Sequence, residues 1–520
     1  MRRCAVRSLL LLISLAVLLP ACSDSKPVAA DQAAGPGTLP PPPRGDDGGD
    51  DPGGGGEPPP VATVRFDDAA VDLMHPGGYP SDLVADGSGR LYTVADAQIP
   101  SRIVSYTGGS ALATLITLTA NHLIDHDGTS PARAPIATGN GLFGAFVGDL
   151  ELAHHRWLLV TVGAGNSLSD DTSQPLRLAN LVVIDTQTVS VVQTVNLAWP
   201  LAKEGQMSGG GIYQTIPQSL PSMVAFVPAH DGTLTGKVLV AMSNGGGSSA
   251  GLQDFFGGTV QVWRADFGAG QPLSVEPTGK EPADVTRTYV SPHFNPVGLT
   301  AYATAGDSDY VILTSAGASQ FDQNYVAHPT TDAHLEFLDL GATQWRDSWR
   351  VTLGQILPAP QQLARGRDRS GLSFAILTSQ THAAAYFVDL SGLESDPVDP
   401  GALRLLRTVE LTPGAAASVG SGFLPGVALS PARGSAIISS FNSGTLSVLL
   451  LPDDIEFGEI LVDPDPFGSL GPARGSLGAL VAPAGGAADV FFVVNGTFDA
   501  SFQPARSSFL GTLTVDGGLP

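Results

Sequence analysis

A three-strand pattern recurs seven times between residues 61 and 520 and restricts the fold of this chain more than any other feature. Each copy begins with a short strand marked by small residues, Pro or Gly, continues with a more apolar strand, and ends with a third strand that closes on Asp or Gly. The third strands read SRIVSYTG, NLVVIDTQ, TVQVWRAD, HLEFLDLG, AAYFVDLSG, TLSVLLLPD and LGTLTVDG. Most copies continue into a fourth strand, such as LRLLRTVEL. Short β-branched runs between Gly, Asp, Ser and Pro indicate an all-β array.

This repetition predicts a seven-bladed β-propeller of four-stranded blades, because one such sheet cannot bury both faces alone whereas radially stacked sheets can. A pair of β-sandwich domains is the alternative, but it does not predict the same signature in every unit. The last unit stops after its third strand, FLGTLTV, and an unpaired apolar strand would leave an exposed edge. We expect VATVRF, residues 61–66, to complete the last blade and close the ring.

The repeats resemble those of the bacterial YVTN-type and NHL-type propellers, whose blades run from a short strand through an Asp/Gly turn to an apolar strand. The resemblance covers residues 61–520 as architecture. No blade carries a complete YVTN signature, and VQVWRAD departs from the ending of a WD repeat. The resemblance therefore implies a fold and leaves the function open.

The first 21 residues are predicted to be a lipoprotein signal peptide. A basic stretch, MRRCAVR, precedes the apolar run SLLLLISLAVLL, which is too short for a permanent membrane-spanning helix. LPAC, which ends at Cys22, resembles the lipobox of bacterial lipoproteins, and this implies lipidation of Cys22. An ordinary secretory signal is the alternative. Ser23 stands where retention in the inner membrane would require Asp, so the resemblance implies an exported, lipid-anchored envelope protein, with the outer membrane favoured.

Residues 22–60 are rich in Pro, Gly and Asp and contain few large apolar side chains, which predicts a disordered tether rather than a folded unit. Cys4 would leave with the signal peptide, so Cys22 would be the only cysteine of the mature chain and no internal disulfide is expected. The net charge of −23 argues against binding to nucleic acid. A monomer is expected.

Long insertions gather on one rim of the predicted propeller. Connections between second and third strands share a rim with the connections between blades, and the longest ones fall on blades two to four: GAGNSLSDDTSQPLR, SNGGGSSAGLQDFFGG and SAGASQFDQNYVAHPTTDA. Loops longer than about a dozen residues are unusual unless they are functional or disordered. Binding residues also tend to lie on loops carried by a scaffold. We therefore predict a binding or scaffold module that presents this rim to an envelope protein or a glycan.

Candidate binding residues on this rim are aromatic and histidine side chains among small polar neighbours: His126, Phe255, Phe256, Phe321, Tyr325 and His328. Exposed aromatic side chains in such surroundings favour contact with protein or glycan. Alternatively, the two adjacent phenylalanines pin their loop to the blade.

Acidic residues on the same rim suggest a divalent cation such as calcium, which prefers oxygen ligands on a glycine-assisted turn. The candidate ligands are Asp125, Asp127, Asp170 and Asp171. A solvated acidic turn without a bound ion is the alternative.

The second class of function is a metal-assisted, lactonase-like hydrolase at the mouth of the central tunnel. Such a site requires side chains that converge from different blades, and the nearest candidates are Asp82, Asp149 and His293. The run GNGLFG at 139–144 matches G-x-G-x-x-G but lacks the strand-to-helix context of a dinucleotide site. No G-x-S-x-G, H-E-x-x-H or C-x-x-C-H motif is present. The sequence assigns neither catalytic residues nor a ligand.

Overall fold

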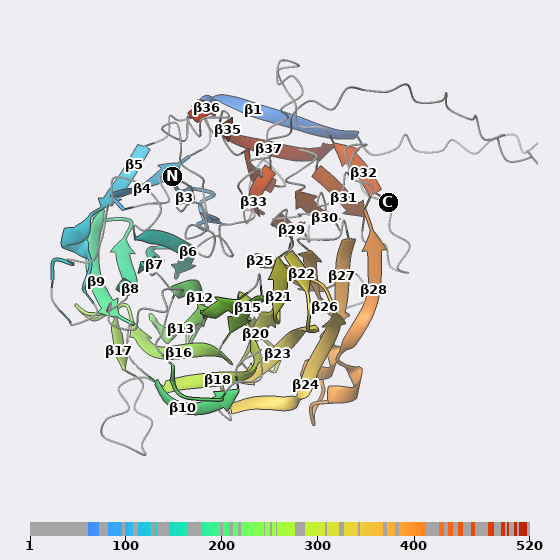
Figure 1. Cartoon of the computed structure of the whole chain (residues 1–520). Coiled ribbons are helices and arrows are strands. Elements are labelled where there is room, and N and C mark those ends of the chain that lie inside the picture. Colours follow the sequence, from blue (N-terminus) through green and yellow to red (C-terminus); the bar gives the residue numbers. More distant parts are fainter. Residues whose placement is uncertain are drawn as a thin grey trace, which may run out of the picture.

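A computed structural model describes residues 61–71 and most of residues 82–516. Within the second range, the description leaves out 96–98, 108–112, 126–127, 129, 133–144, 165–177, 198–200, 207–211, 217–219, 244, 250–251, 256, 276–286, 307–308, 322–326, 342–343, 368–371, 380–383, 412–425, 431–434, 440–445, 451–458, 463–476, 483–489, 495–496, 499–503 and 507–508. The described strands form antiparallel sheets arranged as a ring around a central axis, which is the architecture of a β-propeller (Figure 1).

Six of these sheets are each built from one continuous stretch of chain, with the first strand innermost (Figure 1). In chain order their strands are β2 (Leu83–Ala85), β3 (Leu91–Val94), β4 (Ser101–Tyr106) and β5 (Ala113–Leu118); β6 (Phe146–Ala153), β7 (Trp157–Ala164), β8 (Leu178–Asp185) and β9 (Ser190–Asn196); β12 (Leu220–Pro228), β13 (Thr235–Ser243), β16 (Gly257–Asp266) and β17 (Leu273–Val275), with β18 (Arg287–Phe294); β19 (Pro296–Ala303), β20 (Asp309–Ser315), β23 (Ala333–Asp339) and β24 (Gln344–Gly354); β25 (Pro358–Arg367), β26 (Ser373–Ser379), β27 (Ala384–Asp389) and β28 (Arg404–Glu410); and β29 (Gly426–Ser430), β30 (Ser435–Ser439), β31 (Leu446–Leu450) and β32 (Glu459–Val462).

A further four-stranded sheet joins the two ends of the described chain. It consists of β33 (Leu477–Val481), β34 (Val490–Val494), β37 (Phe509–Asp516) and β1 (Val61–Val71), with β1 outermost. The register of β1 and β37 pairs Val61 with Asp516 and Phe66 with Gly511. Six sheets each take all of their strands from one continuous stretch of chain. The predicted pairing of residues 61–66 with the last strand is confirmed. The last unit supplies three strands and takes the fourth from residues 61–66.

The innermost strands form a closed circuit, in which each contacts the innermost strand of the sheet on either side: β2, β6, β12, β19, β25, β29, β33 and again β2. Several of these strands begin with a β-bulge, at Val147/Leu150 in β6, Pro221/Met223 in β12 and Pro296/Gly298 in β19. A bulge bends and twists a strand locally. In these three innermost strands, the bulge lies near the first residues of the strand.

The outer edge of the third sheet is irregular. Two strands share this edge: β17 pairs with Trp263–Ala265 of β16, and β18 pairs with Gly257–Val262 of the same strand. Pro292 lies within β18. Proline interrupts the pattern of a regular strand but is tolerated at a sheet edge, which is the position that β18 occupies.

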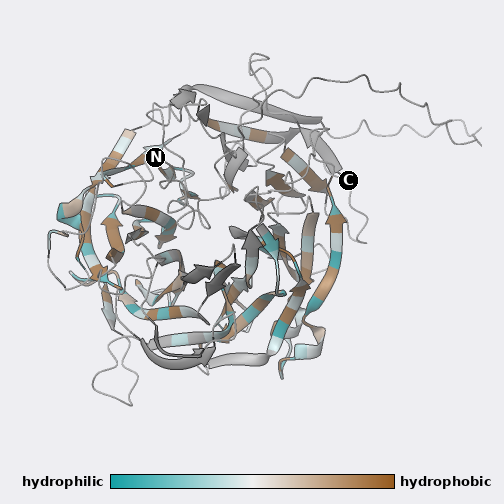
Figure 2. Ribbon diagram, in the orientation of Figure 1, coloured by the Kyte–Doolittle hydropathy of each residue, from teal (hydrophilic) through white to brown (hydrophobic). Residues whose placement is uncertain are grey.

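The core lies between neighbouring sheets. Every residue of β8 and of β26 is buried, whereas the outer strand β28 is mostly exposed or half-buried. Middle strands covered on both faces read as continuous apolar runs rather than as an alternating pattern, and Figure 2 shows this contrast along the ring. Ile103 and Leu158 are fully buried between the first and second sheets. Burial of each such side chain stabilises the fold by about 1.5–3 kcal/mol.

Short elements complete the described chain. Three 3-10 helices are present, η2 (Ala120–His122), η3 (Ser391–Glu394) and η4 (Pro400–Ala402). Additional hairpins are β10 (Leu201–Gln206) with β11 (Ile212–Ile216), and β35 (Thr497–Phe498) with β36 (Pro504–Arg506). No helix among the described residues has the length and hydropathy needed to cross a membrane.

Candidate functional site

Insertions from two neighbouring sheets combine into one accessory sheet, which we call the rim sheet. It contains β14 (Gly245–Ser249) and β15 (Leu252–Phe255), between the second and third strands of the third sheet. It also contains β21 (Ser319–Phe321) and β22 (Ala327–Pro329), at the equivalent place in the fourth sheet. β15 pairs with β21. Two connections that the sequence analysis placed on one rim therefore meet there and pair.

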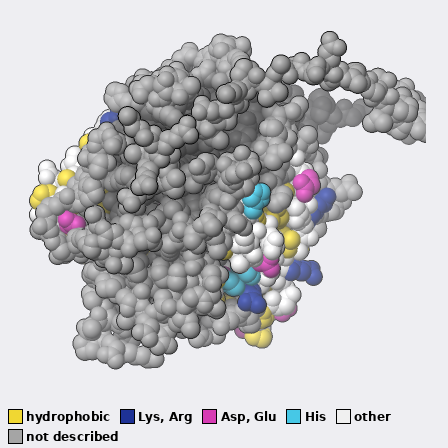
Figure 3. Space-filling model, viewed as in Figure 1, with side chains coloured by type: hydrophobic (Ala, Val, Ile, Leu, Met, Phe, Trp, Pro, Cys, Tyr) yellow, Lys and Arg dark blue, Asp and Glu magenta, His cyan; other side chains and the backbone are white. Residues whose placement is uncertain are grey.

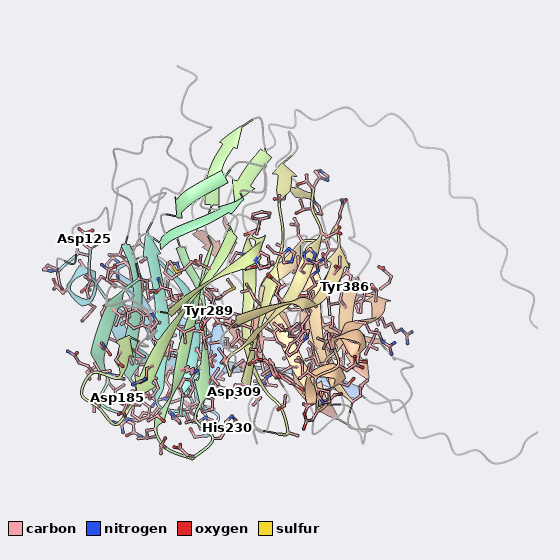
Figure 4. The ribbon with its side chains drawn as sticks, turned by 90° about the horizontal axis from the view of Figure 1, so that it is seen from below. Asp125, Asp185, His230, Tyr289, Asp309 and Tyr386 are labelled. Atoms are coloured by element: carbon pink, nitrogen blue, oxygen red, sulfur yellow. The ribbon has the colours of Figure 1, made fainter. Side chains whose placement is uncertain are left out.

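The rim sheet and the β10–β11 hairpin project from the same end of the molecule. In Figure 4 both lie at the end opposite to the labelled Asp185, His230 and Asp309. The hairpin belongs to the connection between the second and third sheets. Figure 3 views the molecule along the ring axis and shows histidine side chains beside basic and acidic groups at its right side, with further charged groups at the left edge. The loop-rich rim thus contains regular secondary structure of its own.

The predicted acidic turn on this rim is described only at Asp125. Its carbonyl oxygen accepts hydrogen bonds from Gly128 N (2.9 Å) and Asn196 Nδ2 (3.1 Å), and Gly128 has a φ of +84°. The preceding residue, Ile124, is held through its N–H and C=O by the Asn180 side chain, at 2.8 and 2.9 Å. The Asp125 side chain is 3% exposed. The glycine-assisted turn is therefore present and fastened to the second sheet, with its first carboxyl group buried.

Most other predicted rim residues lie outside the part of the chain that the structure describes, namely His126, Asp127, Asp170, Asp171, Phe256 and Tyr325. Phe255 and Phe321 lie in β15 and β21 of the rim sheet, where the backbone is described. His328 lies in β22, opposite Gln320, with an exposed side chain. The cation and the contact residues stay predictions.

Two of the three predicted tunnel-mouth residues come together at the axis. Asp82 immediately precedes β2, and Asp149 lies in the bulged start of β6. Their carboxyl groups are hydrogen-bonded to each other. Burial, together with the neighbouring charge of Asp82, raises the pKa of Asp149 well above its usual range. Burial also raises the pKa of Asp82, although its hydrogen bonds to Asp149, Leu83 and Leu150 oppose this.

Glu151 extends this acidic group, which we call the axial carboxyl cluster (Asp82, Asp149 and Glu151). Burial, followed by the charge of Asp82, raises the pKa of Glu151 to about 8. A backbone hydrogen bond from Phe226 in β12 and the positive charge of Arg365 in β25 act in the opposite direction. Arg365 lies 5.7 Å from the centre of the Tyr302 ring. The sequence analysis missed Glu151, although its place two residues after Asp149 in a strand was a usable signal.

The third predicted tunnel-mouth residue, His293, lies away from the innermost strands that carry Asp82 and Asp149. It lies in β18 and stacks on His334 of β23, with ring centroids 3.8 Å apart and planes at 17°. His293 belongs to the boundary between the third and fourth sheets because β18 runs along the outer edge of β16 before the chain enters β19.

A buried carboxylate lies beside this histidine pair. Glu336 accepts hydrogen bonds from Ser291 Oγ (2.6 and 2.8 Å) and Ser315 Oγ (2.5 Å). Burial lowers the pKa of His293 to about 4, and burial also lowers the pKa of His334. Neither Glu336 nor His334 was singled out in the sequence, although a glutamate within the apolar strand HLEFLDL was a visible exception. Among the described residues, no group of three or more His, Cys, Asp or Glu side chains is arranged to hold a metal ion.

Comparison with known proteins gives likeness of fold only. No protein-family model matches the chain, and no curated protein sequence matches it. Among solved structures, the Dos1 propeller is 10% identical, over 85% of this chain and 94% of that one, with a TM-score of 0.46. The Cps50 (Swd1) β-propeller domain of Myceliophteria thermophila is 11% identical, over 86% and 99%, with a TM-score of 0.45. Virginiamycin B lyase of Staphylococcus aureus is 6% identical, over 88% and 99%, with a TM-score of 0.40.

Proposed function

We propose that this protein is a non-enzymatic binding or scaffold module of the cell envelope that engages a protein or a glycan through its loop-rich rim. The observation that carries the proposal is the rim sheet, in which insertions of two neighbouring sheets pair through β15 and β21. A fold of this kind hosts many functions and does not select one. Loops that extend a scaffold on one side are where binding residues concentrate.

The ring that carries the rim is proposed to have seven blades. Six sheets come from contiguous chain, and we count the sheet β33-β34-β37-β1 as the seventh. Its inner strand β33 contacts both β29 and β2, as the inner strand of a blade does. The insertions then fall on the second to fourth blades, so they are adjacent around the ring and form one surface rather than scattered loops.

A tether is proposed to hold the propeller at the membrane. Cys22 would carry the lipid, residues 22–60 would act as a flexible spacer, and the outer membrane is the favoured location. Replacing Cys22 with Ala in the full-length chain should shift the protein from the membrane fraction to the soluble fraction. It should also abolish metabolic labelling with palmitate. Continued membrane fractionation with no labelling in either form would remove the lipid anchor from the proposal.

Binding is tested with the full-length protein and a variant in which residues 245–255 are replaced by a short Gly-Ser turn. The probes are isolated peptidoglycan sacculi for the glycan arm and detergent-extracted outer-membrane proteins for the protein arm. We expect one arm to retain the unaltered protein and to lose most of the variant. Val189 and Leu234, 48% and 44% exposed in turns at the opposite end, supply the matched control as a double alanine variant. Equal retention of all three proteins would contradict a binding role for the rim.

A second function, hydrolysis at the tunnel mouth, is favoured by one observation: the hydrogen-bonded pair of Asp82 and Asp149. A carboxyl pair that shares a proton can serve in acid–base catalysis. Elemental mass spectrometry of the dialysed full-length protein, together with a lactone-hydrolysis assay, distinguishes the two functions. Stoichiometric metal and turnover that is lost in Asp149→Ala would favour the hydrolase. A metal-free, inactive protein that binds through its rim supports the binding module.

A further inference from the structure

The innermost strand of each sheet has no neighbouring strand on its axial side, so amide groups that point toward the axis need other acceptors. At two successive sheet boundaries, the acceptor is an aspartate of the preceding sheet. Asp82 Oδ2, beside β2, accepts a hydrogen bond from Leu150 N in β6 (3.0 Å). Asp149 Oδ2, in β6, accepts one from Val224 N in β12 (2.8 Å). These two carboxyl groups therefore connect the innermost strands of three successive sheets.

Asp82 and Asp149 are themselves held firmly in place by their own sheets. Thr93 Oγ1 in β3 donates to the Asp82 carbonyl oxygen (2.5 Å), and Thr161 Oγ1 in β7 accepts from Asp149 N (2.7 Å). Each threonine lies in the second strand of the same sheet as its aspartate. These two hydrogen bonds hold the backbone at both members of the carboxyl pair.

The hydrogen bonds also decide which carboxyl group carries a proton. Both oxygens of Asp82 face amide donors, because Oδ1 accepts from Leu83 N (2.7 Å) while Oδ2 accepts from Leu150 N. Asp149 Oδ2 accepts from Val224 N, so we assign the contact with Asp82 to its other oxygen, Oδ1. Two carboxyl groups in direct contact cannot both be ionised. Among the described residues, Asp149 Oδ1 is the oxygen of the pair that accepts from no amide group, so we assign the proton to it.

We propose that Asp82 and Asp149 form a proton-dependent latch across the first, second and third sheets, in which Asp149 Oδ1 donates the shared proton to Asp82. Removal of this proton places two carboxylates in contact and weakens both inter-sheet attachments. The latch is built on the innermost strands and acts on the ring itself. It is therefore independent of the proposed binding rim, and failure of one proposal would leave the other unaffected.

Two further charged groups face the latch. Glu151, on the same strand as Asp149, lies within electrostatic range of Asp82, and Arg365 of β25 acts on Glu151 from across the axis. The other inner strands packed against β2 and β6 are β12 and β33, and their sequences, LPSMVAFVP and LGALV, contain no titratable residue. The pH response of this region therefore comes from the axial carboxyl cluster, moderated by a single arginine.

The direction of the pH response follows from the raised pKa values of the cluster. Asp149 and Glu151 keep their protons in the folded protein at a pH where the unfolded chain, with carboxyl pKa values of about 4, has lost them. A group whose pKa is raised by folding contributes stability at low pH and loses that contribution as the pH rises through the folded pKa. Each retained proton changes the unfolding equilibrium constant about tenfold per pH unit. The stability that this cluster contributes therefore falls as the pH rises above about 4, and for Glu151 the fall continues to about pH 8.

The test compares thermal unfolding of the full-length protein, purified in a non-ionic detergent, with that of two isosteric variants between pH 5 and pH 9. In Asp149→Asn, the amide NH₂ replaces the donated proton and the amide oxygen still accepts from Val224 N. We expect this variant to fold. Its unfolding equilibrium constant should depend on pH less steeply than that of the unaltered protein, by about a factor of ten per pH unit, because the retained proton of Asp149 is absent. In Asp82→Asn, an NH₂ group must face the amide of Leu83 or Leu150, so we expect a lower Tm at every pH.

Hydrogen exchange supplies a local readout for the same variants. Peptides that contain Leu150 and Val224 should exchange faster at pH 9 than at pH 6 in the unaltered protein, after correction for intrinsic rates. In Asp149→Asn this difference should disappear. The proposal is overturned if Asp149→Asn fails to fold, if it keeps the full pH dependence, or if it is destabilised more than Asp82→Asn.

Discussion

The two ends of the ring are built on opposite plans. On the rim opposite the insertions, the turns are short, and an aspartate side chain closes each by accepting a hydrogen bond from the backbone amide two residues later. Asp185 accepts from Gln187 N (3.0 Å), and Asp389 accepts from Ser391 N (2.9 Å). This explains why the third strands of the repeat end in Asp. On the loop-rich rim, the connections are long and pair with one another in the rim sheet.

The opposite rim also ties neighbouring sheets together. His230 Nε2 of the third sheet lies 3.0 Å from Asp309 Oδ1 of the fourth, near the labelled base of Figure 4. Glu394, beside the fifth sheet, accepts hydrogen bonds from the Tyr302 hydroxyl and from Ala305 N (2.9 Å) of the fourth sheet. The contrast teaches that polar groups at one end serve stability, which leaves the other end able to vary in length and sequence.

Both rims depend on closure of the ring, so the largest effect is expected from deletion of residues 61–71. This removes β1 and exposes the whole outer edge of β37. We expect the loss to approach the total stability of a typical domain, about 5–15 kcal/mol, with aggregation on heating. Thermal unfolding followed by circular dichroism measures it, with deletion of residues 30–50, in the proposed tether, as control. An unchanged Tm would refute closure by the N-terminal strand.

Glu394→Gln tests whether the opposite rim is the stabilising one. The change removes a charged acceptor shared by the Tyr302 hydroxyl and Ala305 N, and hydrogen bonds to charged groups contribute about 1.5–3 kcal/mol. We expect a loss of about 2 kcal/mol in urea unfolding. Glu410→Gln, at an exposed site on the outer strand β28, is the matched control and should change stability by less than about 0.5 kcal/mol. Equal losses of stability in the two variants would contradict a special stabilising role for the opposite rim.

Acid should weaken the boundary between the third and fourth sheets through the stacked histidines. Folding lowers the pKa of His293 to about 4, so the folded protein binds fewer protons than the unfolded chain below about pH 6.5, and stability is lost as the pH falls through that range. Because both rings are partly exposed, we expect a loss of about 1 kcal/mol between pH 7 and pH 5. His293→Gln should remove part of this loss, whereas His328→Gln, at an exposed site, should retain it. A Tm that is flat from pH 7 to pH 5 in the unaltered protein would contradict this.

The smallest effect on stability is expected on the loop-rich rim itself. Replacing residues 245–255 by a Gly-Ser turn removes two strands of the rim sheet but no strand of the ring. Shortening a surface insertion changes loop-closure entropy only slightly, so the free energy of unfolding should change by less than about 0.5 kcal/mol. Urea unfolding of this variant measures the change directly. A loss as large as that of Glu394→Gln would show that the rim sheet is structural.

The ring itself was predictable from local pattern. Each radial sheet repeats the same order of apolar strands, and turn chemistry marks their ends, so strands from β2 to β37 fall where the repeat places them. At the outer edge of the third sheet, Pro292 interrupts the strand pattern of β18, and an edge strand tolerates this interruption. The rim sheet was missed because Gly- and Ser-rich strands such as β14 carry little β-propensity of their own.

The axial carboxyl cluster was predictable only in part. Asp82 and Asp149 are visible as equivalent positions of two repeats, SDL and GDL, but their mutual contact depends on how neighbouring sheets pack. The position of His293 relative to the axis depends on β18, which pairs with the outer edge of β16. Contacts between sheets depend on packing geometry, which no single repeat encodes.

The pairing of Val61 with Asp516 has a consequence for how the chain reaches its final state. Synthesis delivers β1 first and β37 near the end, so β1 must wait while the intervening sheets are made. Contacts inside each sheet are local and form quickly, whereas contacts between distant segments form slowly because they must overcome loop-closure entropy. Docking of β1 onto β37 is therefore the expected last step of assembly, and until then an open arc with two unprotected strand edges is the species most prone to self-association.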